Sequence, residues 1–270
     1  MSLIDQLLQA RYGDAAPTAV AASNELIDAL LDHKSVRAYL PDALPEGTLE
    51  LLISAAQSAS TSSNLQAWSV VAVEDTQRKE RLAKLSGNQQ HIIDAPLFLA
   101  WIADLARLEK VIDDAGESTD GLNLIESFLI GVIDATLAAQ NVVVAAESLG
   151  LGTVYIGGLR NHPELVAEEL GLPPRTFPVF GLVVGVPDPD KPAAVKPRLP
   201  QSAVLHWERY QQDTHDSAVN QYDKVIGKFY ASQNLPQQQW TQHITNRVKN
   251  GSTGTRTRLL QSITNLGFKI

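Results

Sequence analysis

The chain has 270 residues, 44% of them hydrophobic and 19% charged, which is the composition of an ordinary globular protein. Lys and Arg number 22 against 30 Asp and Glu, and this net charge of −8 argues against general binding to nucleic acid or anionic membranes. Cysteine is absent, which excludes disulfides, thiolate-bound metals and thiol nucleophiles. A redox function would therefore need a bound cofactor. The six histidines show no metal-site spacing, so no metal is predicted.

The first half of the chain alternates helical and strand patterns. Residues 1–22 are alanine-rich and predict an extension or a marginal helix, without the pattern of a signal peptide, so we predict a cytoplasmic protein. Apolar spacing predicts helices over 24–33, 45–59 and 76–86, with a polar loop at 60–66. Strands are predicted at 69–74 and at the buried run 97–103, with a further loop between Gly87 and that run.

A long apolar helix is predicted over 122–149, after an acidic insertion at 105–121 to which the sequence assigns no role. Polar residues interrupt the helix, so it does not read as a membrane span. Because its apolar residues cover more than one face, burial by a second copy of the chain is expected.

The second half predicts a strand at 153–157, a helix from a capping box of Asn161 and Glu164 to Gly171, and a strand at 178–187. The tail is more polar, with helices around 219–231 and 240–250. The predicted class is α/β or α+β. The predicted organisation is an N-terminal extension (1–22), a core (23–200) and a C-terminal arm packed on that core (201–270).

Glycines follow the third predicted strand in GLGTVYIGGLRN (150–161). This is not a dinucleotide-binding fingerprint, because the first glycines follow a helix and Tyr155 occupies the third glycine position. The pair Gly157-Gly158 suits either a tight turn or a close approach of the backbone to a planar ligand.

Two short cationic segments suit a phosphate group. His33-Lys34-Ser35-Val36-Arg37 combines cations with a hydroxyl, and Lys196-Pro197-Arg198 places two cations on a stiff coil. A solvated helix end and a surface loop are the alternative interpretations.

Uncharged donors and acceptors gather in residues 60–66 and again in Gln89, Gln90 and His91. A flavin ring needs such groups for its polar edge, although each segment taken alone also fits an ordinary polar loop.

These segments, in this order and spacing, resemble the nitroreductase superfamily from about residue 33 to 200. They resemble most closely its NADPH-dependent flavin reductase and nitroreductase A branch. The resemblance implies an α+β fold, with a mixed sheet flanked by helices, and an intertwined homodimer that binds FMN at its interface. The helix at 122–149 is similar to the dimer-core helix of that family.

The resemblance also implies roles for individual residues. A backbone N–H near Gly157 would reach N5 of the flavin, and no side chain is assigned a catalytic role. Contacts with the phosphate and ribityl chain are implied for His33, Lys34, Ser35, Arg37, Lys196 and Arg198. Contacts around the ring are implied for Thr61, Ser62, Asn64, Gln66, Gln89, His91, Tyr155, Ile156, Gly157 and Gly158.

Two departures from the family pattern concern cations. Lys34 stands where the family usually has Arg, and residues 231–239 lack the cations that hold the 2′-phosphate of NADPH in that branch. The cations that could substitute are Arg247, Lys249, Arg256 and Arg258, with Arg256 the best candidate, so NADPH is predicted to be favoured over NADH, though weakly.

The implied activity is a ping-pong transfer of two electrons from NAD(P)H through FMN to a nitroaromatic, a quinone or free flavin. Two alternatives stay open: a non-enzymatic FMN storage protein, and a flavin-fragmenting or dehalogenating member of the superfamily.

Overall fold

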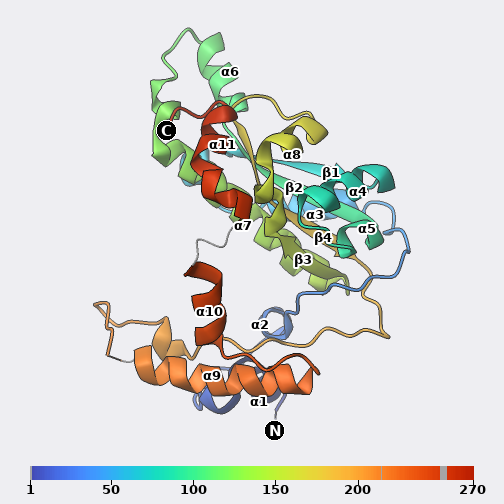
Figure 1. The fold of residues 1–270 in the computed structure, drawn as a ribbon, viewed down its shortest axis with the longest axis vertical. Coiled ribbons are helices and arrows are strands. Elements are labelled where there is room, and N and C mark those ends of the chain that lie inside the picture. Colours follow the sequence, from blue (N-terminus) through green and yellow to red (C-terminus); the bar gives the residue numbers. More distant parts are fainter. Residues whose placement is uncertain (1, 214, 250–253) are drawn as a thin grey trace. The chain divides into compact units, whose positions relative to one another are not determined.

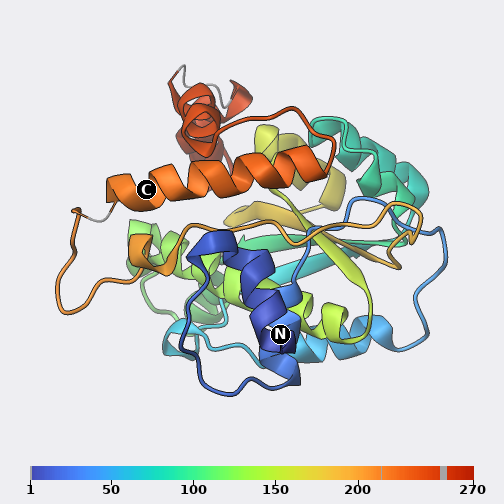
Figure 2. The same cartoon turned by 90° about the horizontal axis from the view of Figure 1, so that it is seen from below.

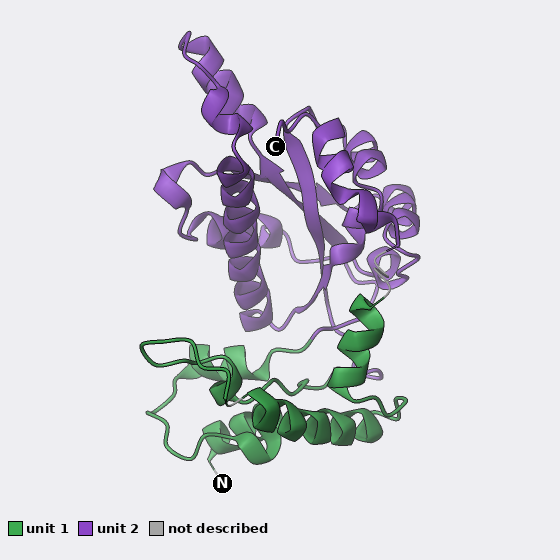
Figure 3. Ribbon diagram, turned by 60° about the vertical axis from the view of Figure 1, so that its left-hand side comes forward, with its two compact units in different colours: residues 1–34, 194–253 green, residues 35–193, 254–270 purple. Residues whose placement is uncertain are grey.

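The computed structural model describes residues 2–213, 215–249 and 254–270. The chain forms two compact units, drawn in two colours in Figure 3: unit 1 is residues 1–34 and 194–253, and unit 2 is residues 35–193 and 254–270. Unit 1 thus combines segments from both ends of the chain, whereas the predicted division followed chain order. The predicted boundaries after residues 22 and 200 both fall within unit 1.

A four-stranded sheet forms the centre of unit 2. Its strands are β1 (Trp68–Val73), β2 (Leu97–Asp104), β3 (Gly152–Ile156) and β4 (Thr176–Gly185), in the order β1-β2-β4-β3. All three strand pairs are antiparallel, whereas a mixed sheet was expected. The parallel element among the described residues is a single bridge between Ser35 and Thr153, on the free edge of β3. The four strands confirm the predicted ones to within two residues.

Alternating side chains of β2 divide the core of unit 2 into two layers, and Figure 1 shows helices on both sides of the sheet. On one face Leu99 and Trp101 pack with helices α3 (Thr48–Gln57) and α7 (Ile125–Ser148). On the other face Phe98 and Ile102 pack with α4 (Thr76–Leu85), α5 (His91–Asp94) and α8 (Pro163–Leu170). The sheet is therefore covered by helices on both faces, as the α+β prediction requires. Two further helices, α6 (Ala106–Asp114) and α11 (Leu259–Asn265), complete the unit.

Some helix ends differ from prediction. Helix α3 begins at Thr48 and not at Pro45, because Gly47 takes a left-handed conformation with φ of 80°. The predicted loop before β2 contains the short helix α5. The capping box at Asn161 is wrong: His162 precedes α8 and no side chain caps that helix. Asn161 instead ends the 3₁₀ turn Gly157–Asn161, and its Oδ1 accepts a hydrogen bond from Arg256.

Unit 1 is helical, with α1 (Leu3–Tyr12), α2 (Glu25–Asp32), α9 (His215–Ser232) and α10 (Trp240–Val248); α1 and the long α9 are visible in Figure 2. The N-terminal segment contains a well-formed helix, since Ser2 and Asp5 form a capping box and Leu8 is buried. The predicted tail helices are present, although α9 begins four residues early and residue 250 lies outside the described residues.

Helix α7 is long and apolar enough to span a membrane by length and composition, the one such helix among the described residues. Its polar residues nevertheless have partners in the core: Asp134 is 1% exposed, and Asn141 Nδ2 donates to the Ala55 carbonyl at 3.0 Å. A buried side of the helix packs on β2 and α3. A second side carries an exposed apolar stripe at four-residue spacing: Ile125, Leu129, Ile133 and Leu137.

Candidate functional site

The loop between α3 and β1 has an unusual backbone. Ser63, Asn64 and Gln66 have φ values of 49°, 53° and 50°, in the left-handed region that favours glycine. Each such non-glycine residue costs roughly 1–2 kcal/mol, less for Asn. Strain of this kind persists only where the surroundings enforce it, and it gathers at functional sites.

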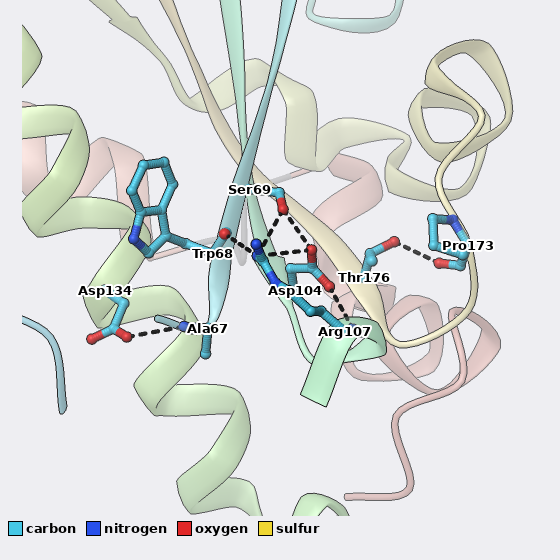
Figure 4. A network of polar contacts seen from close by, with 8 residues as sticks. All are labelled: Ala67, Trp68, Ser69, Asp104, Arg107, Asp134, Pro173 and Thr176. Carbon is cyan, nitrogen blue, oxygen red and sulfur yellow. Dashed lines mark hydrogen bonds and ion pairs between the residues drawn. The ribbon is translucent and has the colours of Figure 1, made fainter. Parts of the chain in front are cut away.

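A buried carboxylate on α7 enforces this conformation. The Ser62 N–H donates to Asp134 Oδ1 at 3.0 Å, and the Ala67 N–H donates to Asp134 Oδ2 at 3.2 Å. The second of these bonds is drawn in Figure 4. Asp134 therefore holds both ends of the strained loop, while the side chains of Asn64 and Gln66 remain exposed. Hydrogen bonds to a charged group are worth roughly 1.5–3 kcal/mol each, enough to offset the local strain.

The strand that follows the loop is anchored by a second polar network (Figure 4). Arg107 Nη2 donates to the Trp68 carbonyl at 2.6 Å, and Ser69 Oγ donates to Asp104 Oδ2 at 2.5 Å. Asp104 is the last residue of β2 and Arg107 lies at the start of the predicted insertion, so the junction between them tethers the first residues of β1.

Residues 35–37 run along the free edge of β3. The Val36 N–H donates to the Thr153 carbonyl at 2.9 Å. A Cβ on residue 152 would lie 2.7 Å from Cγ2 of Val36. The close packing of Val36 on β3 therefore requires glycine at position 152. Because side chains alternate along an extended segment, buried Val36 leaves Ser35 and Arg37 exposed.

His91, at the start of α5, has an unsatisfied ring nitrogen. Its Nε2 is buried and has no hydrogen-bond partner among the described residues. Burial lowers the pKa of His91, and the positive charge of Arg37 lowers it further. The imidazole is therefore neutral at neutral pH, and it can give or take one hydrogen bond from a ligand.

The turn after β3 is packed tightly against the residues before α5. A Cβ on Gly158 would lie 2.3 Å from the Ser86 carbonyl oxygen and 2.8 Å from Gln89 Nε2. Gln89 Nε2 itself donates to the Ser86 carbonyl at 2.8 Å, which engages one of its two N–H groups and leaves its Oε1 as the acceptor for a ligand.

Arg256 holds the same turn from the C-terminal segment. Its Nη2 donates to the Gly157 carbonyl at 2.7 Å and its Nε donates to Asn161 Oδ1 at 2.8 Å. Neighbouring Arg160 donates to the Val179 carbonyl, and burial together with the charge of Arg256 lowers the pKa of Arg160. Arg256, expected at the nucleotide phosphate, thus also supports the backbone of the glycine turn.

Tyr155 and Ile156 point to opposite faces of β3. The Tyr155 ring is 37% exposed, packs edge-on against Phe180 at 5.1 Å, and donates from its hydroxyl to Gln140 Oε1 at 3.3 Å. Ile156 is fully buried on the α4 and α8 side. Only its backbone could contact a ligand at this edge.

The remaining predicted cations lie in unit 1. Lys34 pairs with Asp32 at 2.9 Å in an exposed ion pair. Lys196 Nζ lies 5.5 Å from the centre of the Tyr230 ring, and Arg198 is exposed with its Nη1 donating to the Lys196 carbonyl at 3.1 Å.

One buried arginine brings the two cationic segments of unit 1 together. Arg11 donates to the carbonyls of His33 and Lys196, each at 2.9 Å, and Arg198 donates its N–H to the Arg11 carbonyl at 2.8 Å. Arg247 and Lys249, in contrast, are exposed at the end of α10.

Sequence reasoning missed the residues that organise the loops: Arg11, Asp134 and the Asn161–Arg256 pair. In the sequence, Asp134 is one of the polar residues that interrupt the apolar helix predicted over 122–149. That interruption was itself the available signal, because a lone carboxylate in a buried helix needs partners. Arg11 gave no comparable signal, since a basic residue in the last turn of a helix is ordinary.

The donor set fits FMN. The ring needs uncharged donors and acceptors, of the kind that the loop 61–66, Gln89 and the glycine turn carry, and the phosphate needs a cation, of the kind that exposed Arg37 carries. The buried, unpaired nitrogen of His91 is the kind of polar atom that a ligand satisfies.

Comparison with known proteins identifies the family. The model "Nitroreductase family" matches residues 30–186, and "Nitroreductase family, C-terminal domain" matches residues 196–270. The chain is 38% identical over 231 residues to an FMN reductase (NADPH) of Bacillus subtilis (strain 168), covering 84% of this chain and 92% of that protein. It is 43% identical over 211 residues to an FMN reductase (NAD(P)H) of the same strain, covering 76% and 83%.

A solved structure of NfrA2 from B. megaterium superposes with a TM-score of 0.86 at 38% identity, covering 92% of this chain and 99% of that one. The resemblance, the fold class and the prediction of an oxidoreductase enzyme are thereby confirmed. The chain belongs to the nitroreductase family.

Proposed function

We propose that the protein is an FMN-dependent oxidoreductase. It transfers two electrons from NAD(P)H, with NADPH favoured, to a small acceptor such as a nitroaromatic, a quinone or free flavin. The order is ping-pong: the nucleotide leaves before the acceptor binds. The observation that carries the proposal is the strained, uncharged loop 61–66 held by buried Asp134, in a member of this family.

FMN, when bound, supplies the two-electron chemistry that no side chain of a cysteine-free protein offers. The chain's own residues bind and orient. We assign the phosphate and ribityl chain to His33, Lys34, Ser35, Arg37, Lys196 and Arg198. We assign the ring to Thr61, Ser62, Asn64, Gln66, Gln89, His91, Tyr155, the backbone of Ile156, Gly157 and Gly158.

The glycine turn has a specific role in this proposal. The leading N–H groups of a 3₁₀ turn have no acceptor within the turn, and we assign that of Gly157 to N5 of the ring. No side chain is required as an acid or a base, because the role of the protein is to hold the reactants close together and correctly oriented.

The nucleotide preference rests on three cations. The two B. subtilis relatives carry names that differ in the nucleotide, NADPH in one and NAD(P)H in the other. We propose that Arg247, Lys249 and Arg256 favour NADPH. Exposed charge pairs contribute at most about 1 kcal/mol each, so the preference is modest.

A second copy of the chain is the proposed cover for the stripe Ile125, Leu129, Ile133 and Leu137, whose exposed fractions are 54%, 45%, 51% and 43%. Such a stripe on a monomer would leave a contiguous apolar surface in water. The cytoplasmic location stays a prediction.

The absorbance spectrum of the purified protein tests the cofactor assignment. Flavin bands in the blue region, with FMN as the molecule released on denaturation, are the expected result. A colourless protein that does not take up added FMN would contradict it, and released FAD would contradict the assignment of a single phosphate.

A further inference from the structure

Arg11 is a buried arginine of unit 1, and it lies in a segment whose composition predicts only an extension or a marginal helix. It occupies the last turn of α1 and is 6% exposed. Its guanidinium donates to three main-chain carbonyls: Nη1 to Lys196 at 2.9 Å, and Nη2 to Leu31 at 2.7 Å and to His33 at 2.9 Å.

The backbone of Arg11 adds a fourth link, because its carbonyl accepts the N–H of Arg198 at 2.8 Å. The coil that contains Lys196 and Arg198 is also held from α9, where the Tyr222 hydroxyl donates to the Pro197 carbonyl at 3.0 Å. Three segments far apart in sequence therefore meet at one side chain: the end of α1, the end of α2 and the coil 196–198.

The chemistry of this junction requires arginine. A guanidinium has five N–H donors in a fixed planar fork, so it can serve carbonyls that lie in different directions. A lysine offers its three donors from one nitrogen and cannot span the same set. Removing the guanidinium would break its hydrogen bonds to the carbonyls of Leu31, His33 and Lys196 and release the two cationic segments from each other.

We propose that Arg11 is a positioning residue for phosphate binding. It fixes the backbone from which His33 and Lys34 project against the backbone from which Lys196 and Arg198 project, so that both segments present their cations to the same phosphate. Helix α1 then contributes to cofactor binding through Arg11. This inference rests on the proposed FMN function.

Affinity for FMN and for riboflavin, which lacks the phosphate, separates this role from general stability. In Arg11→Ala the dissociation constant for FMN should rise about 10-fold, whereas that for riboflavin should change less than about 2-fold. Arg11→Lys keeps the charge with a poorer reach, and should fall between wild type and Arg11→Ala.

The matched control is Leu8→Ala. Leu8 is 6% exposed on the same helix, so this variant weakens the packing of α1 without touching the carbonyls. It should lose stability but keep the wild-type ratio of FMN to riboflavin affinity. Equal weakening of both ligands in Arg11→Ala, no weakening of either, or the same selective loss in Leu8→Ala would overturn the proposal.

A measurement without ligand keeps the inference testable if Arg11→Ala fails to fold. Arg198 is an exposed residue, yet its amide hydrogen should exchange slowly in flavin-free wild type because the Arg11 carbonyl accepts it. Exchange at the rate of an unprotected amide would overturn the proposal. If the wild type binds no FMN, only the proposed function is contradicted, because the exchange experiment still measures the contact between Arg11 and Arg198.

Discussion

The loop of unit 2 that we assign to the flavin ring and the coil of unit 1 that we assign to the phosphate are organised by opposite means. In unit 2 a buried anion, Asp134, receives N–H groups at both ends of a strained loop that bears uncharged side chains. In unit 1 a buried cation, Arg11, donates to carbonyls of segments that bear exposed cations.

The chemistry of the proposed ligand accounts for this difference. A flavin ring is neutral and planar, so it is recognised by donors and acceptors that must already point the right way. A phosphate carries a concentrated negative charge. Lys and Arg side chains can adjust their rotamers to reach it, provided that the backbone that bears them is fixed. Changes in the two regions should therefore leave distinct signatures on FMN and riboflavin binding.

The largest effect is expected at helix α7, which carries Asp134 on one side and the exposed apolar stripe on another. The wild type should be a homodimer by light scattering at micromolar concentration. Ile133→Asp, which places a charge in the stripe, should convert it to a monomer, because obligate interfaces commonly bury more than ~2,000 Å² of mostly apolar surface. Leu165→Asp, an exposed leucine on α8, is the control and should stay dimeric. A monomeric wild type with FMN bound would contradict the assignment of this stripe.

At the phosphate coil, Arg198→Ala should weaken FMN binding about 10- to 100-fold, the worth of one charge-assisted hydrogen bond. Riboflavin should be affected much less. Titration of the flavin-free protein followed by fluorescence measures both constants, with exposed Arg209→Ala as the control. Equal losses for the two ligands would show that Arg198 does not contact the phosphate.

At the ring loop, Asp134→Asn should weaken FMN and riboflavin by the same factor, about 10-fold, because an amide can accept only one of the two N–H groups. Glu126→Gln, an equal loss of charge at an exposed position of α7, should leave both affinities unchanged. If Asp134→Asn weakened the affinity for FMN but not that for riboflavin, the assignment of this loop to the ring would be wrong.

These two regions also show what the sequence could and could not reveal. Residue types and order were enough to predict the four strands, the helix now described as Ile125–Ser148 and the family. The residues that hold these two regions in place could not be predicted. Arg11 donates to main-chain carbonyls about 20 and 185 residues away, and every residue has such a carbonyl, so the sequence does not mark the partners.

The error at Asn161 has the same origin. The local pattern with Glu164 favoured a capping box, but a tertiary partner, Arg256, takes the side chain instead. Backbone strain at Ser63 and Gln66 was equally invisible, since neither residue type favours a left-handed conformation.

A smaller effect is expected for the nucleotide. The ratio of kcat/KM for NADPH over NADH should exceed one in the wild type and fall by less than about tenfold in Arg256→Ala. The same variant should also disturb the glycine turn, because it removes a donor from the Gly157 carbonyl. Equal use of both nucleotides by the wild type would refute the preference. An unchanged preference in Arg256→Ala would transfer the role to Arg247 and Lys249.

The smallest effect concerns pH. The folded pKa of His91 lies below the ordinary 6.5, so the unfolded chain binds the proton more readily. Its contribution to stability is complete above pH 6.5 and is lost as pH falls toward the folded pKa. The free energy of unfolding in urea should thus decline from pH 7.5 to 5.5, and His91→Gln should decline less. His243→Gln, an exposed control, should follow the wild type, and identical slopes in all three would contradict the environment described for His91.

The most direct test of an FMN oxidoreductase is to mix the purified, flavin-loaded protein with NADPH in a stopped-flow instrument without oxygen. The account predicts that the blue absorbance of the bound flavin disappears within milliseconds to seconds, and that it returns when a quinone or nitroaromatic is added. Flavin absorbance that persists for minutes in excess NADPH and NADH would contradict the account, and would identify a protein that stores FMN without using it.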